Sequence, residues 1–322
     1  MTPIQTKIHA DLQAAFGITP DTVTPVTGGY LNKKWKLQTS DGQTYLLKLF
    51  SPTRYSPEKY DRLEAALQRQ KYVHACGVSC PRVYDVQGQI LRRIPTDITG
   101  DMAYMLMSYE NGTMPTPASV TAAQMTSLGE QCAKMHAALA ELDATGDHYY
   151  PLDSAGIVKR LSDHRASLSG FTDYQIPPKL DAILPDLDAA FFDRLPRQLC
   201  HEDFSADNLL FCGDTAIILD FDRGQYSFPL HDIGRALLSL ALDGGVLRRP
   251  FIRAFADGYR KHRPLTQDDL ADALRITFAC EFPWWIRPDY EKITEPKVWR
   301  FVREMYFLMQ VWEDIPSITA GG

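Results

Sequence analysis

The chain has 322 residues, of which 45% are hydrophobic and 23% are charged, and its formal net charge is −6. This length exceeds one small core, so one large domain or two closely joined domains are expected. The negative charge argues against a nucleic-acid-binding protein, because a basic binding face usually shows in the total charge. No apolar run of the sequence reaches about 18 residues, so we expect no membrane-spanning helix.

The N-terminal segment, residues 2–16, is expected to form an amphipathic helix. Ile4, Ile8, Leu12 and Phe16 recur at the spacing of one helix face. The polar composition of the segment is not that of a signal peptide. The six cysteines of the chain form no CxxC pair and no dense framework, which is typical of reduced thiols in a cytoplasmic protein.

Two strands are expected next, at residues 34–40 and 43–50. Asp41-Gly42 between them is a two-residue hairpin signal. The pair Gly28-Gly29 precedes the first strand. It is either a simple turn or a place where backbone N–H groups can approach phosphate groups.

Lys48 is a charged residue inside the apolar second strand. Burying an unpaired ammonium group is costly, so this lysine needs an explanation. It either protects an edge strand from aggregation or binds phosphate groups while paired with a helix glutamate. Residues 57–75 are expected to form the helix, and Glu64 lies near its apolar stripe. Glu64 is therefore the predicted partner, with Glu58, near the helix start, as the alternative.

Three further strands are expected at residues 82–86, 89–94 and 103–109, and the chain then becomes mainly helical. We therefore expect an N-terminal domain over residues 1–108 and a C-terminal domain over residues 109–322. The helices expected in the first part of the C-terminal domain span residues 127–142, 157–168 and 180–195. His136, on the first of them, is expected to be a packed structural residue.

Residues 198–240 hold the most informative pattern of the sequence. Asp203 and Asn208 precede two short apolar runs that a polar turn joins into a hairpin. Asp220 and Asp222 follow the hairpin. Three oxygen-bearing side chains, from Asp203, Asn208 and Asp220, are thus expected to converge at one end of the structure.

Phosphoryl transfer is the chemistry that needs this set. Mg²⁺ takes few protein ligands and prefers hard oxygens, and Asn208 and Asp220 fit that requirement. The acceptor hydroxyl needs a carboxylate that orients it and takes its proton, and Asp203 fits that role. Asp222 is expected either to support the metal or to face the acceptor.

His201-x-Asp203-x4-Asn208, Ile218-Leu219-Asp220-Phe221-Asp222, Pro229 and Asp232-Ile233-Gly234 together resemble the aminoglycoside/choline phosphotransferase family. The wording of these motifs is most similar to the spore-coat (CotS-like) kinase branch. The resemblance implies an α+β, bilobal, protein-kinase-like fold, with a small antiparallel-sheet N-lobe and a mainly helical C-lobe. It also implies transfer of the γ-phosphoryl group of ATP, or alternatively GTP, to a hydroxyl of a small molecule in the presence of Mg²⁺. The acceptor could be an amino alcohol, an aminoglycoside, homoserine or a sugar. The sequence departs from the family pattern at Glu202, where glycine is usual.

The same resemblance implies roles for residues of the N-lobe. Lys48, ordered by Glu64, would hold the α- and β-phosphates, and Gly28 and Gly29 would lie close to them. The backbone near Met107 and Tyr109 would bind the adenine ring. Within the C-lobe, the resemblance implies structural roles for His201 and Asp232.

Helices are expected in the last third of the chain at residues 236–242, 250–262, 268–282 and 297–311. Its aromatic cluster is either core or an acceptor pocket, because the C-terminal helices grip the substrate in this family. Glu281, Trp284 and Trp285 would suit a cationic amine through charge pairing and cation–π contacts.

A non-catalytic kinase-like protein, structural or nucleotide-binding, is the alternative to an enzyme. The joint presence of Lys48, Asp203, Asn208 and Asp220 argues against it, because a scaffold has no need of all four. A protein kinase is disfavoured, because no long activation segment follows Asp220. The sequence does not indicate an oligomeric state.

Overall fold

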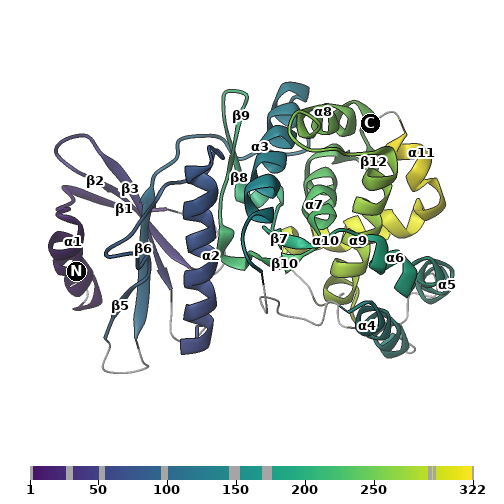
Figure 1. The fold of residues 1–322 in the computed structure, drawn as a ribbon, viewed down its shortest axis with the longest axis horizontal. Helices are drawn as coiled ribbons and strands as arrows, with labels where there is room; N and C mark the ends of the chain where they lie inside the picture. Colours follow the sequence, from purple (N-terminus) through teal and green to yellow (C-terminus); the bar gives the residue numbers. More distant parts are fainter. Residues whose placement is uncertain are drawn as a thin grey trace. The chain divides into compact units, whose positions relative to one another are not determined.

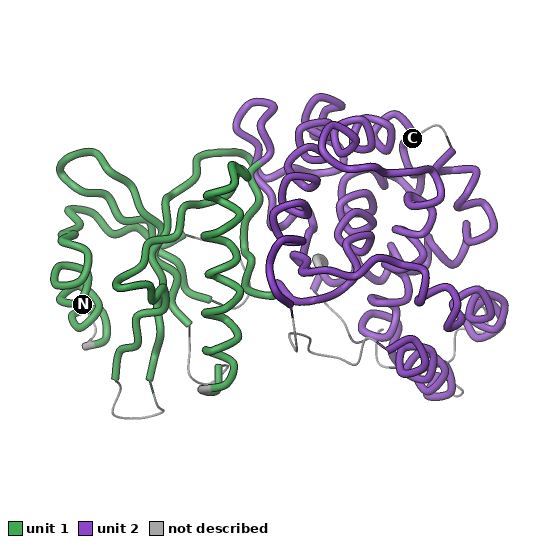
Figure 2. The backbone as a smooth tube through the Cα atoms, viewed as in Figure 1, with its two compact units in different colours: residues 1–113, 217–223 green, residues 114–216, 224–322 purple. Residues whose placement is uncertain are grey.

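The computed structural model describes residues 3–26, 32–50, 55–95, 101–144, 153–168, 176–288, 292 and 295–320. The chain divides into two compact units, drawn in two colours in Figure 2. Unit 1 comprises residues 1–113 and 217–223, and unit 2 comprises residues 114–216 and 224–322. The first division thus comes after Thr113, later than the predicted break after residue 108. The segment with Asp220 and Asp222 belongs to unit 1.

Unit 1 is built on one antiparallel sheet in the strand order β1-β2-β3-β6-β4, with β5 also paired to β6. The strands are β1 (Thr22–Pro25), β2 (Lys33–Gln38), β3 (Thr44–Phe50), β4 (Val83–Tyr84), β5 (Arg92–Ile94) and β6 (Met102–Ser108). The expected strands are therefore present, and the hairpin at Asp41-Gly42 joins β2 to β3. Because β3 lies between β2 and β6, the edge-strand interpretation of Lys48 is wrong.

Helices cover both faces of this sheet (Figure 1). α1 (Pro3–Phe16) packs on one face and α2 (Pro57–Ala75) on the other. Side chains alternate along a strand, so β6 contributes to two separate cores. Met105 lies in the core beneath α2, whereas Tyr104 and Leu106 lie in the core beneath α1.

Unit 2 is mainly helical. Its helices are α3 (Ala122–Ala140), α4 (Ser154–Ser167), α5 (Ile176–Ile183), α6 (Ala189–Arg194), α7 (Pro229–Ala241), α8 (Arg249–Tyr259), α9 (Gln267–Trp285), α10 (Pro296–Gln310) and α11 (Ile315–Thr319). Three two-stranded pairs accompany them: β7 (Gln198–Cys200) with β10 (Gln225–Ser227), β8 (Leu209–Cys212) with β9 (Thr215–Ile218), and β11 (Leu242–Asp243) with β12 (Val246–Leu247). The β8–β9 pair is the hairpin expected from the sequence.

The single helix expected at residues 180–195 is in fact two helices. A short 3₁₀ turn with Pro185 separates α5 from α6, because proline lacks the N–H group that a continuous helix would need. Asp188 then caps α6 by accepting a hydrogen bond from Phe191 N at 2.8 Å. Similarly, the helix expected from residue 236 begins at Pro229, which occupies a position in its first turn.

Two glycines let α3 and α8 pack backbone to backbone. A Cβ atom at Gly258 would lie 1.9 Å from Thr126 O, and one at Gly129 would lie 2.0 Å from Phe255 O. No larger residue fits at either position without moving a helix.

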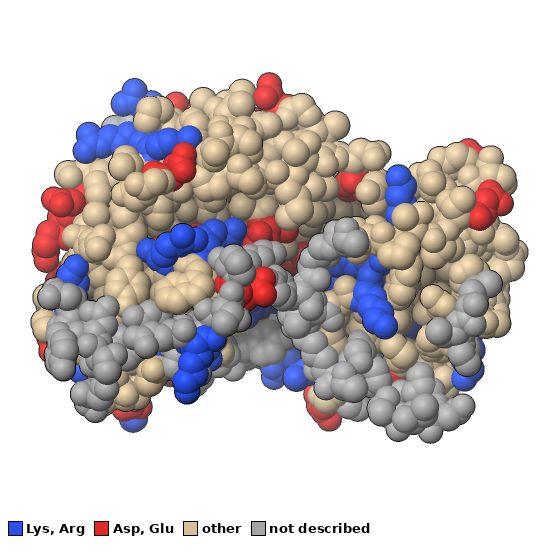
Figure 3. All heavy atoms as spheres, turned by 180° about the vertical axis from the view of Figure 1, so that it is seen from behind, with Lys and Arg blue, Asp and Glu red and all other residues tan. Residues whose placement is uncertain are grey.

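The surface of the described residues carries charges of both signs (Figure 3). On the face shown in Figure 3, Lys and Arg side chains form several small groups between uncharged surface and acidic side chains. No helix within the described part of the chain is both long and apolar enough to cross a membrane.

Candidate active site

Lys48 of β3 is held by the two carboxylates that follow β9. Its Nζ atom lies 2.7 Å from Asp220 Oδ1 and 2.5 Å from Asp222 Oδ2, and the Lys48 side chain is only 2% exposed. The positions are 172 and 174 residues apart in sequence. The structure thus brings together the strand lysine and the acidic pair predicted from the later motif.

Two lysines face the acidic pair of this cluster. Burial alone would lower the pKa of Lys48, but the Asp220 and Asp222 carboxylates outweigh burial and raise it. Burial and the neighbouring Asp220 charge raise the pKa of Asp222 to about 6, although Lys48 opposes this shift. Lys34 Nζ also lies 3.7 Å from Asp220 Oδ2, so with both acids ionised two ammonium groups face two carboxylates. Asp220 is the more exposed of the two acids and offers hard oxygens to a divalent cation.

Asp220 has a left-handed backbone, with φ at 62°. A residue other than glycine in this conformation costs about 1–3 kcal/mol and persists where the surrounding structure imposes it. Here Ile218 N donates a hydrogen bond to Ser79 O at 2.9 Å, and a short 3₁₀ helix (Phe221–Arg223) follows directly. These elements fix the Asp220 carboxylate beside Lys48.

The predicted Glu64–Lys48 pair is wrong. Glu64 Oε1 accepts hydrogen bonds from Ile90 N at 2.9 Å and from Gln68 Nε2 at 2.8 Å, while Oε2 accepts one from Leu91 N at 2.8 Å. The carboxylate therefore serves the backbone that leads into β5. Glu58, the alternative partner, is exposed and bonded to Ser56 Oγ at 2.6 Å.

In unit 2, the loop of residues 201–208 follows strand β7 and is anchored by Asp232 of α7. The Asp232 carboxylate accepts hydrogen bonds from His201 N and Glu202 N, each at 2.8 Å, and contacts His136 Nε2 at 3.2 Å. His136, His201 and Asp232 are all buried. Their expected structural roles are confirmed.

Asp203 and Asn208 are linked within this loop. Asn208 Nδ2 donates to the backbone oxygen of Asp203 at 2.9 Å, and Ser205 N donates to the same oxygen at 2.9 Å. Because the amide nitrogen of Asn208 is used in this way, the side-chain oxygen is the atom of Asn208 that can act as a metal ligand. The Asp203 side chain is partly exposed, as a base that meets an acceptor must be.

Glu202 also has a left-handed backbone, with φ at 66°. Glycine enters this region without strain, which gives a physical reason for the glycine usual in the family that the sequence resembles. Here the Glu202 side chain is held on both oxygens. Gln225 Nε2 donates to Oε2 at 2.8 Å, and His231 Nδ1 lies 3.3 Å from Oε1. The extra charge beside Asp203 is thus matched by a neighbouring imidazole.

Glu281 on α9 is also paired within the protein. Trp285 Nε1 donates to it, His231 Nε2 lies at 3.3 Å and Arg235 Nε at 3.7 Å. Burial alone would raise the pKa of Glu281, but Arg235 and His231 lower it to about 2. The sequence interpretation left this carboxylate available for an amine, and the structure corrects that view.

The aromatic residues near Glu281 differ in environment. The Trp285 ring stacks on Phe301 with centroids 4.6 Å apart, and Trp312 is buried. Trp284, in contrast, is 48% exposed. Core packing therefore accounts for Trp285 and Trp312, whereas it does not account for Trp284.

The remaining predicted nucleotide-binding residues belong to unit 1. Met107 is buried in the core beneath α2. Tyr109 N donates to Thr44 O at 3.3 Å, and Lys36 Nζ lies 4.4 Å from the Tyr109 ring centroid. Gly28 and Gly29 lie outside the described residues.

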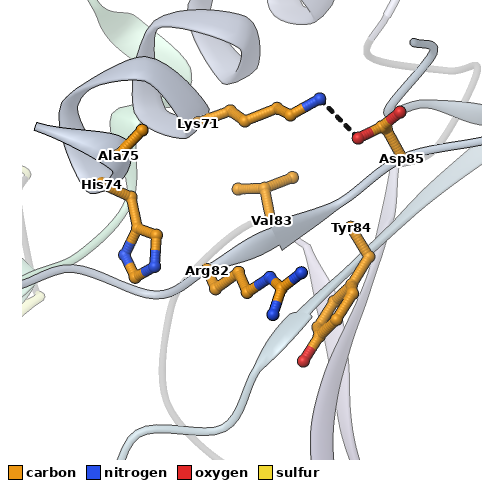
Figure 4. Close-up of a pocket in the computed structure, with 7 residues that line it drawn as sticks. All are labelled: Lys71, His74, Ala75, Arg82, Val83, Tyr84 and Asp85. Atoms are coloured by element: carbon orange, nitrogen blue, oxygen red, sulfur yellow. Dashed lines mark hydrogen bonds and ion pairs between the residues drawn. The ribbon is translucent and has the colours of Figure 1, made fainter.

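A separate cavity of about 250 Å³ lies between α2 and β4 in unit 1 (Figure 4). Lys71 and Asp85 form an ion pair of 2.5 Å at its edge, and His74 Nδ1 lies 2.9 Å from Cys80 O. None of the predicted site residues lines it. This cavity is therefore not the site predicted from the motifs.

The donors present fit Mg²⁺. In the described ranges, no group of three or more His, Cys, Asp or Glu side chains is arranged to hold a metal. Mg²⁺ does not need such a cage, because it retains waters and substrate oxygens. The Asp220 carboxylate and the Asn208 amide oxygen are donors of the kind it takes.

The sequence did not indicate several polar and charged residues of unit 2 that pair with one another or with site residues. Four of them are buried, namely Gln225, His231, Arg235 and Glu304, and Arg300 is partly exposed. One signal was available. His231 and Arg235 stand four residues apart in a segment that is otherwise apolar around Asp232, and such charges are rarely buried without partners. Their partners lie tens of residues away, which no local pattern reveals.

Comparisons with known proteins agree with this geometry. The phosphotransferase enzyme family matches residues 22–265. A homoserine kinase of Paramagnetospirillum magneticum is 24% identical over 302 residues, covering 88% of this chain and 87% of its own.

Two solved structures share the fold. Amicoumacin kinase hAmiN, in complex with AMP-PNP and Ca²⁺, has a TM-score of 0.66 at 16% identity, covering 98% of this chain and 97% of its own. A microcompartment-associated aminopropanol kinase has a TM-score of 0.60 at 14% identity, with 97% and 99% covered. The expected kinase-like fold is confirmed. The likeness to the spore-coat branch stays a prediction.

Proposed function

Because the chain belongs to the phosphotransferase enzyme family and is a small-molecule kinase with a hydroxyl acceptor, we propose that ATP is its donor and homoserine or a related amino alcohol its acceptor. The observation that carries the proposal is the buried ion pairing of Lys48 with Asp220 and Asp222. A buried lysine beside two carboxylates offers an ammonium group to a bound anion and hard oxygens to a bound cation. The non-catalytic alternative is not favoured.

Residues of unit 1 would bind the phosphate groups of the nucleotide. Lys48 would hold the α- and β-phosphates of the nucleotide, because its ammonium group is kept charged by its carboxylate partners. Asp222 would keep Lys48 in place while Asp220 binds Mg²⁺. Bound Mg²⁺ would neutralise charge that develops on the phosphate oxygens. Asn208 would be the second protein ligand of the ion. The backbone near Met107 and Tyr109 would bind the adenine.

Asp203 would orient the acceptor hydroxyl and take its proton as the oxygen attacks the γ-phosphorus. The bond to the β-phosphate oxygen breaks in line, and ADP leaves. The 201–208 loop supports this role, because it fixes the backbone of Asp203 by two hydrogen bonds and leaves the carboxylate partly exposed. Phosphoryl transfer relies on such positioning and on electrostatics.

The choice of acceptor rests on the relatives. Five curated relatives, 24% to 27% identical to this chain, carry the name homoserine kinase. The solved structure of similar fold named aminopropanol kinase also has a short amino alcohol in its name. A cytoplasmic location would suit this activity and the six unpaired thiols of the protein.

The substitution Asp203→Asn tests the role of the base. The variant keeps the size of the side chain but loses the carboxylate, so kcat should fall by about 10²–10⁴. ATP binding should stay near wild type. Turnover is measured by coupled ADP release with homoserine, 1-amino-2-propanol, choline and an aminoglycoside, and ATP affinity by calorimetry. If the variant turned over at the wild-type rate, Asp203 would not be the base. If the wild-type protein phosphorylated none of these acceptors, the amino alcohol assignment would be wrong.

A further inference from the structure

Seven charged side chains of unit 2 form one charge chain, a series of ion pairs in which positive and negative residues alternate. In order they are Glu202, His231, Glu281, Arg235, Glu304, Arg300 and Asp207. The N···O separations of successive pairs are 3.3, 3.3, 3.7, 2.6, 3.5 and 2.8 Å. This charge chain runs through helices α7, α9 and α10.

Both ends of this charge chain lie in the 201–208 loop. Glu202 directly precedes Asp203, and Asp207 directly precedes Asn208. The series of ion pairs therefore begins at the residue before Asp203 and ends at the residue before Asn208. The segment between the two ends is held by its own backbone bonds and by Ala206 N, which donates to Ser239 Oγ of α7 at 3.1 Å.

The middle of the charge chain is its most deeply buried part. Arg235 and Glu304 are each 2% exposed, whereas Arg300 and Asp207 are 24% and 22% exposed. Breaking a buried ion pair by removing one partner leaves an uncompensated charge, which is strongly unfavourable. A well-packed apolar set would be at least as stable as buried charges, so stability alone does not account for them. Buried charges that can pair in only one way do specify one arrangement of the segments that carry them.

His231 must carry two protons for the signs to alternate. Each of its ring nitrogens faces a carboxylate oxygen at 3.3 Å, Glu202 on one side and Glu281 on the other. Both nitrogens can donate only in the imidazolium form. Cys280 also lies near, but burial raises the pKa of its thiol to about 11, so the two carboxylates are the relevant anions at neutral pH.

We propose that this chain of charges is a positioning frame, which sets the 201–208 loop on α7, α9 and α10 so that Asp203 and Asn208 are held in working geometry. The inference rests on the proposed function for the roles of those two residues. None of the frame residues needs to touch the substrate. Arg235 also interacts electrostatically with the Asp203 carboxylate. The other frame residues act through the loop.

A substitution that does not contact the loop directly gives the sharpest test. Glu304→Gln keeps the shape of the side chain but removes one charge from the middle of the frame, and Glu304 pairs with Arg235 and Arg300, not with loop residues. Asp272→Asn is the matched control. Asp272 is also buried in unit 2 and forms a two-bond ion pair with Arg194, but it lies outside the frame.

Two measurements on the full-length protein separate positioning from stability. Hydrogen–deuterium exchange of the peptide covering residues 200–209, without nucleotide or Mg²⁺, reports the order of the loop. Steady-state kinetics report kcat and the KM for ATP. In Glu304→Gln, loop exchange should be about tenfold faster and kcat about tenfold lower than in the wild-type protein. The KM for ATP should stay within about threefold of the wild-type value. In Asp272→Asn the melting temperature should fall, while loop exchange and kcat stay at wild type.

A double-mutant cycle at the first link adds a second test, which also serves if Glu304→Gln fails to fold. His231→Gln leaves the Glu202 carboxylate without its imidazolium partner, whereas the double variant removes that carboxylate as well. Glu281 keeps Arg235 in both variants, and Glu202→Gln alone leaves His231 paired with Glu281. The double variant should therefore have loop exchange closer to wild type than His231→Gln, by about threefold to tenfold. Additive effects in the cycle would overturn the proposal, as would equal loop exchange in Glu304→Gln and Asp272→Asn.

The outcome does not depend on the acceptor. Loop exchange is measured without any substrate, so the frame is tested even if homoserine is not phosphorylated. Wild-type turnover in Asp203→Asn would remove the catalytic meaning of the loop but would leave its exchange behaviour as measured. The two failures are therefore distinguishable.

Discussion

Glu64 is a partly buried carboxylate that satisfies two backbone N–H groups instead of a lysine. Glu64→Ala would leave Ile90 N and Leu91 N without this acceptor, at a cost of about 1–3 kcal/mol in the free energy of unfolding. Lys48 keeps both of its carboxylates in this variant, so ATP affinity should stay within about twofold of wild type. Urea denaturation and calorimetric ATP binding measure the two effects. A tenfold loss of ATP affinity without loss of stability would restore the predicted Glu64–Lys48 pair.

Single residues with a chemical signature could be predicted from the sequence. A lysine in an apolar strand and an acidic pair after a buried strand stand out, and the structure joins Lys48 to Asp220 and Asp222. The partner of Lys48 could not be chosen correctly. Helical spacing places Glu64 near the apolar stripe of α2, but the backbone N–H groups that it serves have no side-chain signal.

At the scale of elements, the close crossing of α3 and α8 is the sharpest test of the packing. Gly258→Ala would normally stabilise a helix by about 0.5–1 kcal/mol, because glycine is a poor helix former. Here the added Cβ would lie 1.9 Å from Thr126 O, so the helices must separate and the variant should lose about 1–3 kcal/mol. Thermal unfolding measures the sign. A stabilised variant would show that the two helices do not cross this closely.

Elements with strong local signals were predicted well, and those shaped by packing were not. The Asp41-Gly42 hairpin and the helix over residues 57–75 agree with β2, β3 and α2. The helix expected over residues 180–195 ignored the break that Pro185 and the Asp188 cap impose. The backbone contact of α3 with α8 depends on two glycines in different helices, which no single segment reveals.

For the whole molecule, His231 links stability to pH. Burial alone would lower its pKa, but the nearby Cys280 sulfur and the Glu202 and Glu281 carboxylates raise it well above its ordinary value of about 6.5. The folded state then binds this proton more tightly than the unfolded state. The stabilisation is fully present below pH of about 6.5 and is lost as pH rises through the raised value, by up to about 1.4 kcal/mol per pH unit.

The predicted result is a stability difference between wild type and His231→Gln that shrinks as the pH rises from 6 to 10. Denaturant unfolding of both proteins across this range measures it. Titrations of groups far from His231 are common to the two proteins and cancel in the difference. A difference that stays constant with pH would mean that folding does not change the pKa of His231.

Unit 1 takes in residues 217–223, although its other part ends at Thr113. During synthesis the ribosome must add about a hundred further residues before the partners of Lys48 exist, which takes on the order of 5–20 s at common elongation rates. Until then the ammonium group of a central strand has no Asp220 or Asp222 to receive it. For that interval the nascent unit holds a lysine in a central strand without its carboxylate partners. For the same reason, a fragment that stops at Thr113 is a poor choice for expressing unit 1 alone.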